Sequence, residues 1–172
     1  MRKINFILFL LFLFSCYKET ETPMDYKIHI NDFKMDHIVK NEKKWNLQCK
    51  KSIISEKENT ITCYDVIINI LASDKITTFL KSFKGFGDMN KEIFYLENDV
   101  VVNSFKEKIT VYTSKLYFDT KKEIIYSTTN TRIIKEKEGV EINSIGFQAK
   151  TDLSNIKIFK HTTTKLTNPT QN

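Results

Sequence analysis

The sequence predicts an all-β domain made of consecutive antiparallel hairpins. Phe, Tyr and Ile are abundant, with 13 Phe and 7 Tyr in 172 residues, and aromatic and β-branched side chains favour strands. Apolar and polar residues alternate over Trp45–Cys49 and Ile109–Thr113, as in a strand with one buried and one wet face. No long apolar stripe has a helical period, so the short apolar stretches are interpreted as strands joined by turns.

The polar breaks between these stretches contain Gly, Asn and Asp, the residues that turns favour. We expect breaks at Gly85, Gly87–Asp88, Glu97–Asp99, Asp119–Lys122, Glu138–Gly139 and Thr151–Asp152. The expected strands lie near Lys27–Phe33, Lys44–Ile54, Thr60–Leu71, Lys75–Lys84, Glu92–Leu96, Val100–Phe105, Lys108–Thr113, Lys115–Asp119, Glu123–Thr128, Thr131–Lys137, Val140–Lys150 and Ile156–His161.

The first residues predict export and a lipid anchor. Arg2 and Lys3 precede the apolar run Ile4–Phe14, which suits a signal peptide and is short for a membrane span of about 20 residues. The following Leu13-Phe14-Ser15-Cys16 resembles a bacterial lipobox, which implies cleavage after Ser15 and acylation of Cys16. The alternative is a secretory signal with an incidental cysteine. We therefore divide the chain into a signal peptide (1–15), a lipidated tether (16–26), a β domain (27–161) and a tail (162–172) that is either flexible or contains the end of the last strand.

The chemistry of an enzyme or of a nucleic-acid-binding protein is not apparent. His29, His37 and His161 are scattered, and no nucleophile, nucleotide-binding or metal-ligand motif occurs. Removing Arg2 and Lys3 with the leader lowers the formal net charge from +6 to +4, and no basic run is interleaved with stacking aromatics. We expect a non-enzymatic protein with no cofactor, no metal and no nucleic-acid partner.

Cys49 and Cys63 lie on either side of a turn expected at 55–59. A hairpin centred near Glu56 would place the two cysteines opposite each other, whereas one centred between Lys57 and Glu58 would not. An exported chain can oxidise such a pair. A disulfide and two separate buried thiols are both left open.

Most of the mature chain resembles the LptC family, the periplasmic component of the lipopolysaccharide transport bridge. The resemblance begins with Trp45–Cys49, similar to the family's W-x-L-x-A strand, and continues with Gly87–Asp88 and Phe94–Val100. Ile109–Asp119 resembles L-x-T-x-x-L-x-Y-D, and Ile145–Ala149 resembles the family's G-x-G-F-x-A-D-L ending. The positions that we assign to turns or structural roles are Gly87, Asn98, Gly139 and Gly146.

The resemblance implies an open, twisted β-jellyroll, like LptA and OstA, that carries acyl chains in an apolar groove. It implies lipopolysaccharide or another glycolipid as ligand, LptA-like jellyrolls as edge-to-edge partners and an inner-membrane LptBFG-like ABC transporter. It also implies a periplasmic location; of the two membranes that could hold the anchor, we favour the inner over the outer. The candidate groove residues, which would equally suit an ordinary core, are Trp45, Leu47, Ile109, Val111, Leu116, Phe118 and Phe147.

Two other classes of protein remain open from the sequence. One is a lipoprotein that binds a different amphiphile without forming a bridge. The other is a structural or adhesive surface lipoprotein with a closed, fully packed β-sandwich. A small secreted hydrolase is a third and weaker reading, since no catalytic constellation supports it.

Overall fold

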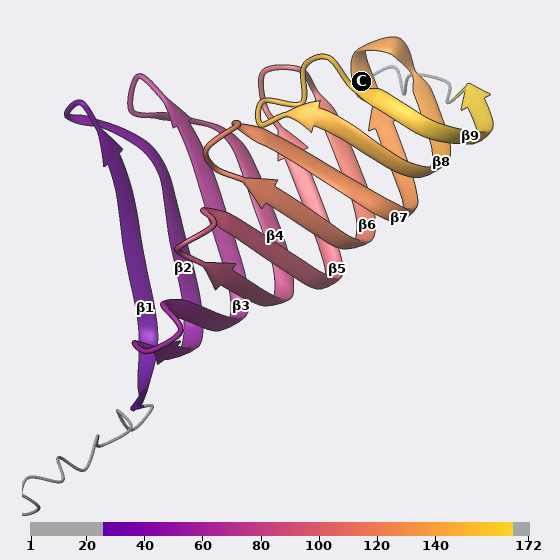
Figure 1. Cartoon of the computed structure of the whole chain (residues 1–172). Helices are drawn as coiled ribbons and strands as arrows, with labels where there is room; N and C mark the ends of the chain where they lie inside the picture. Colours follow the sequence, from indigo (N-terminus) through magenta and orange to yellow (C-terminus); the bar gives the residue numbers. More distant parts are fainter. Residues whose placement is uncertain (1–25, 167–172) are drawn as a thin grey trace, which may run out of the picture.

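The computed structural model describes residues 26–166, which form a single antiparallel sheet with its strands in chain order from β1 to β9. Figure 1 shows this succession, with β1 at one end of the molecule and β9 at the other. A short 3-10 turn, Glu136–Glu138, precedes β8. The strands are β1 (Lys27–Val39), β2 (Glu42–Ser55), β3 (Thr60–Ala72), β4 (Lys75–Asp88), β5 (Ile93–Ser104), β6 (Ile109–Asp119), β7 (Ile124–Lys135), β8 (Val140–Lys150) and β9 (Lys157–Leu166).

The predicted all-β hairpin architecture is confirmed, but the strands are longer than expected. β5, β6 and β7 each cover two of the predicted strands. The break predicted at Glu97–Asp99 lies inside β5, where Asn98 and Asp99 have positive φ angles of 65° and 53°. Gly85 likewise lies inside β4. Both turn predictions are wrong. At Asn98–Asp99 a bulge within the strand uses the residues that a hairpin turn favours, whereas Gly85 pairs regularly with Cys63 and Leu96.

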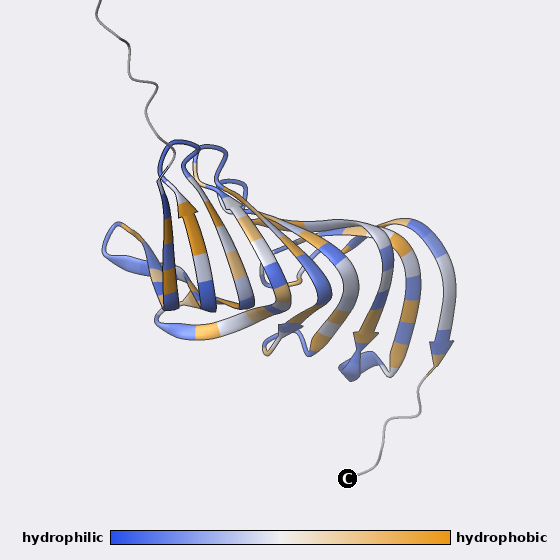
Figure 2. Cartoon of the chain, turned by 90° about the horizontal axis from the view of Figure 1, so that it is seen from below, coloured by the Kyte–Doolittle hydropathy of each residue, from blue (hydrophilic) through white to orange (hydrophobic). Residues whose placement is uncertain are grey.

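The bulges line up into a crease that crosses the whole sheet. Each strand contains one or two residues that pair with none of its neighbouring strands. An unpaired extra residue bends its strand, and Figure 2 shows the strands bent into arcs. The crease runs through Asp32, Lys50, Asp65, Phe83, Asn98–Asp99, Ser114, Thr128–Thr129, Gly146 and Phe159.

The crease folds the sheet over on itself, so that its two halves enclose one apolar core. Trp45 of β2 packs edge-on against Phe94 of β5 and Phe118 of β6, with ring centroids 5.2 and 6.0 Å apart. β2 is a neighbour of neither β5 nor β6 in the sheet, so these ring contacts span the interior between the two halves. The core continues through β8, where Phe147 is fully buried.

The sheet stays open because β1 pairs only with β2 and β9 only with β8. A closed barrel would join these two strands, so the described residues form an open sheet and not a barrel. β9 extends to Leu166, beyond the expected end at His161, and takes in the first residues assigned to the tail. The signal peptide, Cys16 and nearly all of the tether lie outside the described residues. Within 26–166 no helix is long and apolar enough to cross a membrane.

Candidate functional site

The seven residues predicted for the groove all point into the interior of the folded sheet. They come from β2, β6 and β8, and the structure therefore places them along one continuous apolar surface. Each side chain already packs in the core, so a role in binding acyl chains stays a prediction for them. Their exposed fractions are 7% for Trp45, 1% for Leu47, 9% for Ile109, 0% for Val111, 0% for Leu116, 1% for Phe118 and 0% for Phe147.

Trp45 is the largest of these side chains and lies beside the edge strand. Its ring stacks on His37 of β1 at a centroid distance of 4.9 Å, and its other contacts are the rings of Phe94 and Phe118. The indole Nε1 is buried without a hydrogen-bond partner, although indole nitrogens usually find one. Trp45 therefore joins an aromatic cluster that lies one strand away from the open β1 edge.

The interior opens at the β9 end through a recess of about 370 Å³. Its lining is mixed, because the polar or charged residues Glu107, Lys135, Glu138, Ser154 and Asn155 contribute to it together with apolar side chains. Ile109 is the only predicted groove residue that reaches this recess. We call it the C-terminal mouth; its apolar lining residues are Ile109, Ile133, Ile142, Leu153, Ile156 and Ile158.

At the opposite end, Phe33 and Met35 of β1 and Ile54 of β2 pack against the core and stay half-buried. We call this group the N-terminal mouth. Apolar side chains are incompletely covered here because β1 has a strand on one side only. The apolar interior is thus accessible at both ends of the sheet.

The two open edges are β1 and β9, the first and last strands of the sheet. Strand β1 carries Lys34 and Asp36 among its exposed side chains, and β9 carries Lys157 and Lys160. Charged residues on an edge limit unspecific pairing of strands. Both edges nevertheless present unpaired backbone groups over their full lengths.

The four predicted turn residues have different roles. Gly139 follows the 3-10 turn with a φ of 60°, and Gly87 lies at the end of β4, where a Cβ would be 2.8 Å from a methyl of Ile61. Asn98 and Gly146 belong to the crease. Gly146 has a φ of 78°, and a Cβ would lie 2.9 Å from the Ser127 carbonyl oxygen, so both its conformation and its surroundings require glycine.

A row of buried hydroxyl groups along the crease was not predicted from the sequence. The Thr113 hydroxyl lies 3.1 Å from the Asn130 carbonyl oxygen and 3.0 Å from Ser127 Oγ, and Ser82 Oγ donates to the Lys84 carbonyl oxygen. A bulge leaves carbonyl groups without ladder partners, and these hydroxyls satisfy them. The buried hydroxyl residues on the inner side of the crease are Ser52, Ser82, Thr113, Ser127, Thr131 and Ser144.

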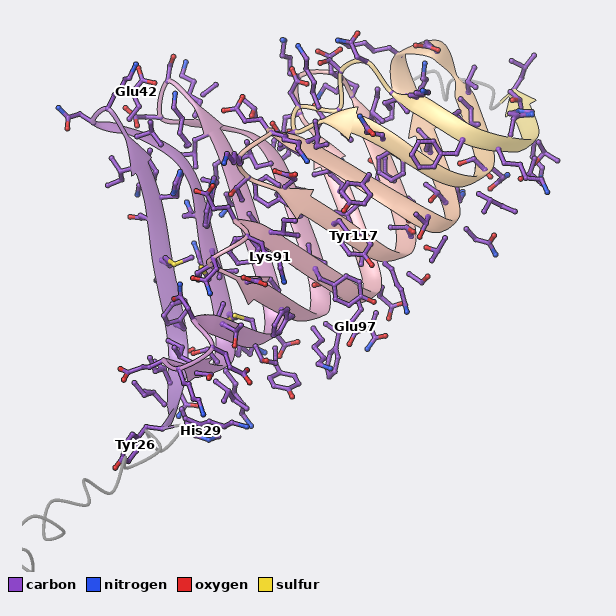
Figure 3. The ribbon with its side chains drawn as sticks, in the orientation of Figure 1. Tyr26, His29, Glu42, Lys91, Glu97 and Tyr117 are labelled. Carbon is purple, nitrogen blue, oxygen red and sulfur yellow. The ribbon has the colours of Figure 1, made fainter. Side chains whose placement is uncertain are left out.

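The charged groups lie on the outer face of the sheet. Lys84 donates a hydrogen bond of 3.0 Å to Glu97, which holds the pKa of the Glu97 carboxyl below its ordinary value of 4.5. Glu97 and Tyr117 project from this face (Figure 3). Arg132 pairs with Glu141 at 2.8 Å. Asp119, at the end of β6, is a buried carboxylate and accepts a hydrogen bond from the Lys122 backbone amide. The core cluster between the two halves of the sheet consists of apolar side chains, so it suits an apolar ligand.

Cys49 and Cys63 face each other inside the N-terminal half of the interior. The β2–β3 hairpin pairs Ser55 with Thr60 and Cys63 with Ser52, which is the register centred between Lys57 and Glu58. The cysteines are therefore not directly opposite, yet their Sγ atoms are only 2.9 Å apart. Both are free thiols in this structure. Three or more metal-ligating side chains are nowhere grouped within residues 26–166.

Comparison with models of known protein families identifies the family of this chain. The family model described as "Lipopolysaccharide-assembly, LptC-related" matches residues 6–167. The chain belongs to this LptC-related family. The LptC resemblance seen in the strand motifs is thereby confirmed.

Solved structures support the fold of this LptC-related chain. It is similar to LptH of Pseudomonas aeruginosa, described as the LptA-homologous periplasmic component of the lipopolysaccharide transport device, with a TM-score of 0.55 and 12% identity. The match covers 67% of this chain and 82% of that one. At this identity the likeness concerns the fold. No curated protein sequence matches the chain.

Proposed function

We propose that this protein is a periplasmic component of a lipopolysaccharide export bridge and that its apolar interior carries the acyl chains. The observation that carries the proposal is the folded sheet itself, whose apolar interior runs from β2 to β8 and is accessible at both mouths. Membership of the LptC-related family supports this ligand. In this proposal the chain is not an enzyme; energy for transport comes from an LptBFG-like ABC transporter.

An acyl chain enters this interior by separating the two halves of the sheet. The groove residues fill the interior in the absence of ligand, so each methylene that enters must replace a contact between side chains. Burial of a methylene contributes about 0.8 kcal/mol, which offsets the loss of those contacts. The phosphorylated sugars of the ligand stay outside, because burial of a charged group among the apolar side chains of the core is costly.

Two open edges support the proposed assembly. β1 and β9 can each add a strand from an LptA-like partner, because a sheet edge offers a row of backbone donors and acceptors. Pairing there would join the N-terminal mouth of one jellyroll to the C-terminal mouth of the next. The grooves of successive molecules would then form one apolar path.

The lipid on Cys16 would hold the protein at a membrane. Several acyl chains anchor a protein stably, whereas one alone does not. In this proposal the anchor replaces a membrane helix and leaves the β domain in the periplasm. The inner membrane is the location that an LptBFG-like partner favours.

Photo-crosslinking from the N-terminal mouth tests the ligand. Benzoylphenylalanine at Phe33, in the full chain expressed in its host, should form adducts with lipopolysaccharide under ultraviolet light. The same residue at Phe83, which is 56% exposed on the outer side of the crease, is the matched control and should form none. A third variant, at Ile156, probes the C-terminal mouth.

Adducts at Phe33 and Ile156 with a lipid that carries no lipopolysaccharide sugar would support the amphiphile-binding alternative. No adduct at either position, with the protein folded and anchored, would contradict a groove and leave a structural lipoprotein. Equal labelling at Phe83 would show that the lipid only touches the surface.

A further inference from the structure

The two thiols in the N-terminal half of the interior form a contact pair. Cys49 of β2 and Cys63 of β3 are 5% and 3% exposed, and their Sγ atoms are 2.9 Å apart. The crease explains the contact. Lys50 and Asp65 are skipped in the β2–β3 register, which turns both cysteines inward although neither is the direct partner of the other.

We propose that Cys49 and Cys63 are a redox pair that closes a disulfide between β2 and β3, with Cys49 as the residue that an incoming disulfide oxidant meets first. The bond requires an Sγ–Sγ distance of about 2.05 Å, so the sulfurs need to approach by less than about 1 Å. Two adjacent strands in a continuous ladder already hold them in place. The inference does not depend on the ligand proposed above.

The surroundings of the two sulfurs differ, and this difference sets the order of reaction. Cys49 lines a recess of about 290 Å³, whereas Cys63 is not among its lining residues. Lys34, Lys50 and Lys81 line the same recess together with Asp32 and Asp65, and the excess of one positive charge favours an anionic oxidant such as oxidised glutathione. Cys49 is therefore the thiol that a small disulfide can reach.

Acid–base behaviour agrees with this order. Burial raises the pKa of both thiols above their ordinary value. For Cys63 the contact with Cys49 raises the pKa further, while for Cys49 the hydrogen bond shared with Cys63 opposes the rise in pKa. Because the thiolate is the nucleophile, Cys49 is the first of the two to react.

The reaction proceeds by two exchanges and balances in atoms and electrons. The Cys49 thiolate attacks one sulfur of a disulfide R–S–S–R, forming a Cys49–S–S–R bond and releasing R–S⁻. The Cys63 thiolate then attacks Cys49 Sγ, forms the Cys49–Cys63 bond and releases the second R–S⁻. The two thiols lose two protons and two electrons, and the oxidant is reduced to two R–SH.

Peptide mapping of the full chain tests the proposal. The protein is extracted from host membranes with its thiols blocked under acid quench, and a second sample is reduced and then treated with oxidised glutathione. We expect a peptide pair linked through Cys49 and Cys63 in both samples. Under glutathione, Cys63→Ser should accumulate a mixed disulfide on Cys49, whereas Cys49→Ser should leave Cys63 at least tenfold less modified.

Quantitative alkylation of both cysteines after denaturation of the glutathione-treated wild type would overturn the redox pair. Equal or faster modification of Cys63 in Cys49→Ser would overturn the order of reaction. Circular dichroism of each variant before treatment confirms that the compared proteins are folded. The wild-type cross-link needs no variant and decides the first point alone.

Discussion

Thr113 stands at the centre of the hydrogen bonds along the crease, and its replacement by valine tests how much they stabilise the fold. Its Oγ1 lies 2.9 Å from Thr129 Oγ1, 3.0 Å from Ser127 Oγ and 3.1 Å from the Asn130 carbonyl oxygen. Valine keeps the shape and leaves these partners without that hydroxyl. Hydrogen bonds contribute about 0.5–1.5 kcal/mol each and a buried polar group left unpaired costs about 1–3 kcal/mol. We therefore expect Thr113→Val to lower the free energy of unfolding by about 2–4 kcal/mol.

Thr78 offers a matched control on β4. It is 0% exposed, and its hydroxyl is buried without a hydrogen-bond partner. Thr78→Val removes an unpaired polar atom, so the free energy of unfolding should stay unchanged or rise by about 1 kcal/mol. The two variants make the same chemical change at two buried sites.

Urea unfolding of the full chain measures both variants, followed by the fluorescence of Trp45 and by circular dichroism. A shift of the midpoint with an unchanged dependence on denaturant reports stability alone. If Thr113→Val and Thr78→Val shift the free energy of unfolding equally, within about 0.5 kcal/mol, the hydroxyl groups along the crease do not stabilise it and the reasoning fails.

Three further predictions concern the crease, the outer face and the edges. Gly146→Ala should lower the free energy of unfolding by about 2 kcal/mol or more, because φ is 78° and the Cβ meets the Ser127 carbonyl oxygen; a loss below about 0.5 kcal/mol in urea unfolding would contradict that geometry. Lys84 depresses the pKa of Glu97. The Glu97 carboxylate therefore contributes stability above the ordinary pKa of 4.5, and this contribution is lost as pH falls through the lower folded value. Lys84→Met should raise the Glu97 pKa in an NMR titration, and an unchanged value would refute the pairing. Benzoylphenylalanine at Phe159 on the β9 edge should capture a like-folded partner in the envelope. The same residue at Phe83 should not, although the exposed fractions of Phe159 and Phe83, 50% and 56%, are similar. Equal capture at both positions would argue against edge pairing.

The sequence predicts the faces of the strands well because the side-chain period of a strand is two. Trp45 and Leu47 alternate with polar neighbours and are buried, as are Ile109 and Val111 on β6. The alternation of apolar and polar residues depends only on which face of the strand is buried. It can therefore be recognised in the sequence without knowing which strands pair.

Bulges and hairpin turns were not distinguished, because both use polar residues that tolerate a positive φ. Asn98–Asp99 has the composition of a hairpin turn, and only the continued pairing of β5 with β6 on both sides of it shows a bulge. A local signal does exist in the sequence. Buried positions step by three across the crease, from Cys63 to Val66 and from Thr113 to Leu116, where a regular strand steps by two.

The approach of the two cysteines could not be predicted from the turn alone. A hairpin centred between Lys57 and Glu58 places Cys63 opposite Ser52 and separates the cysteines in register. The contact depends on the bend at Lys50 and Asp65, which belongs to the whole sheet. Local turn chemistry carries no information about such a bend.

The chain-ordered sheet also has a consequence for how the protein is made. Every strand pairs only with the strands before and after it in the sequence, so no pairing has to wait for a distant segment. Each hairpin closes a short loop, and short loops cost less entropy to close than long ones. If the chain is exported as proposed, it can add one hairpin after another as each emerges. At each stage the strand added last is then the open edge of the sheet. In the finished sheet this edge is β9.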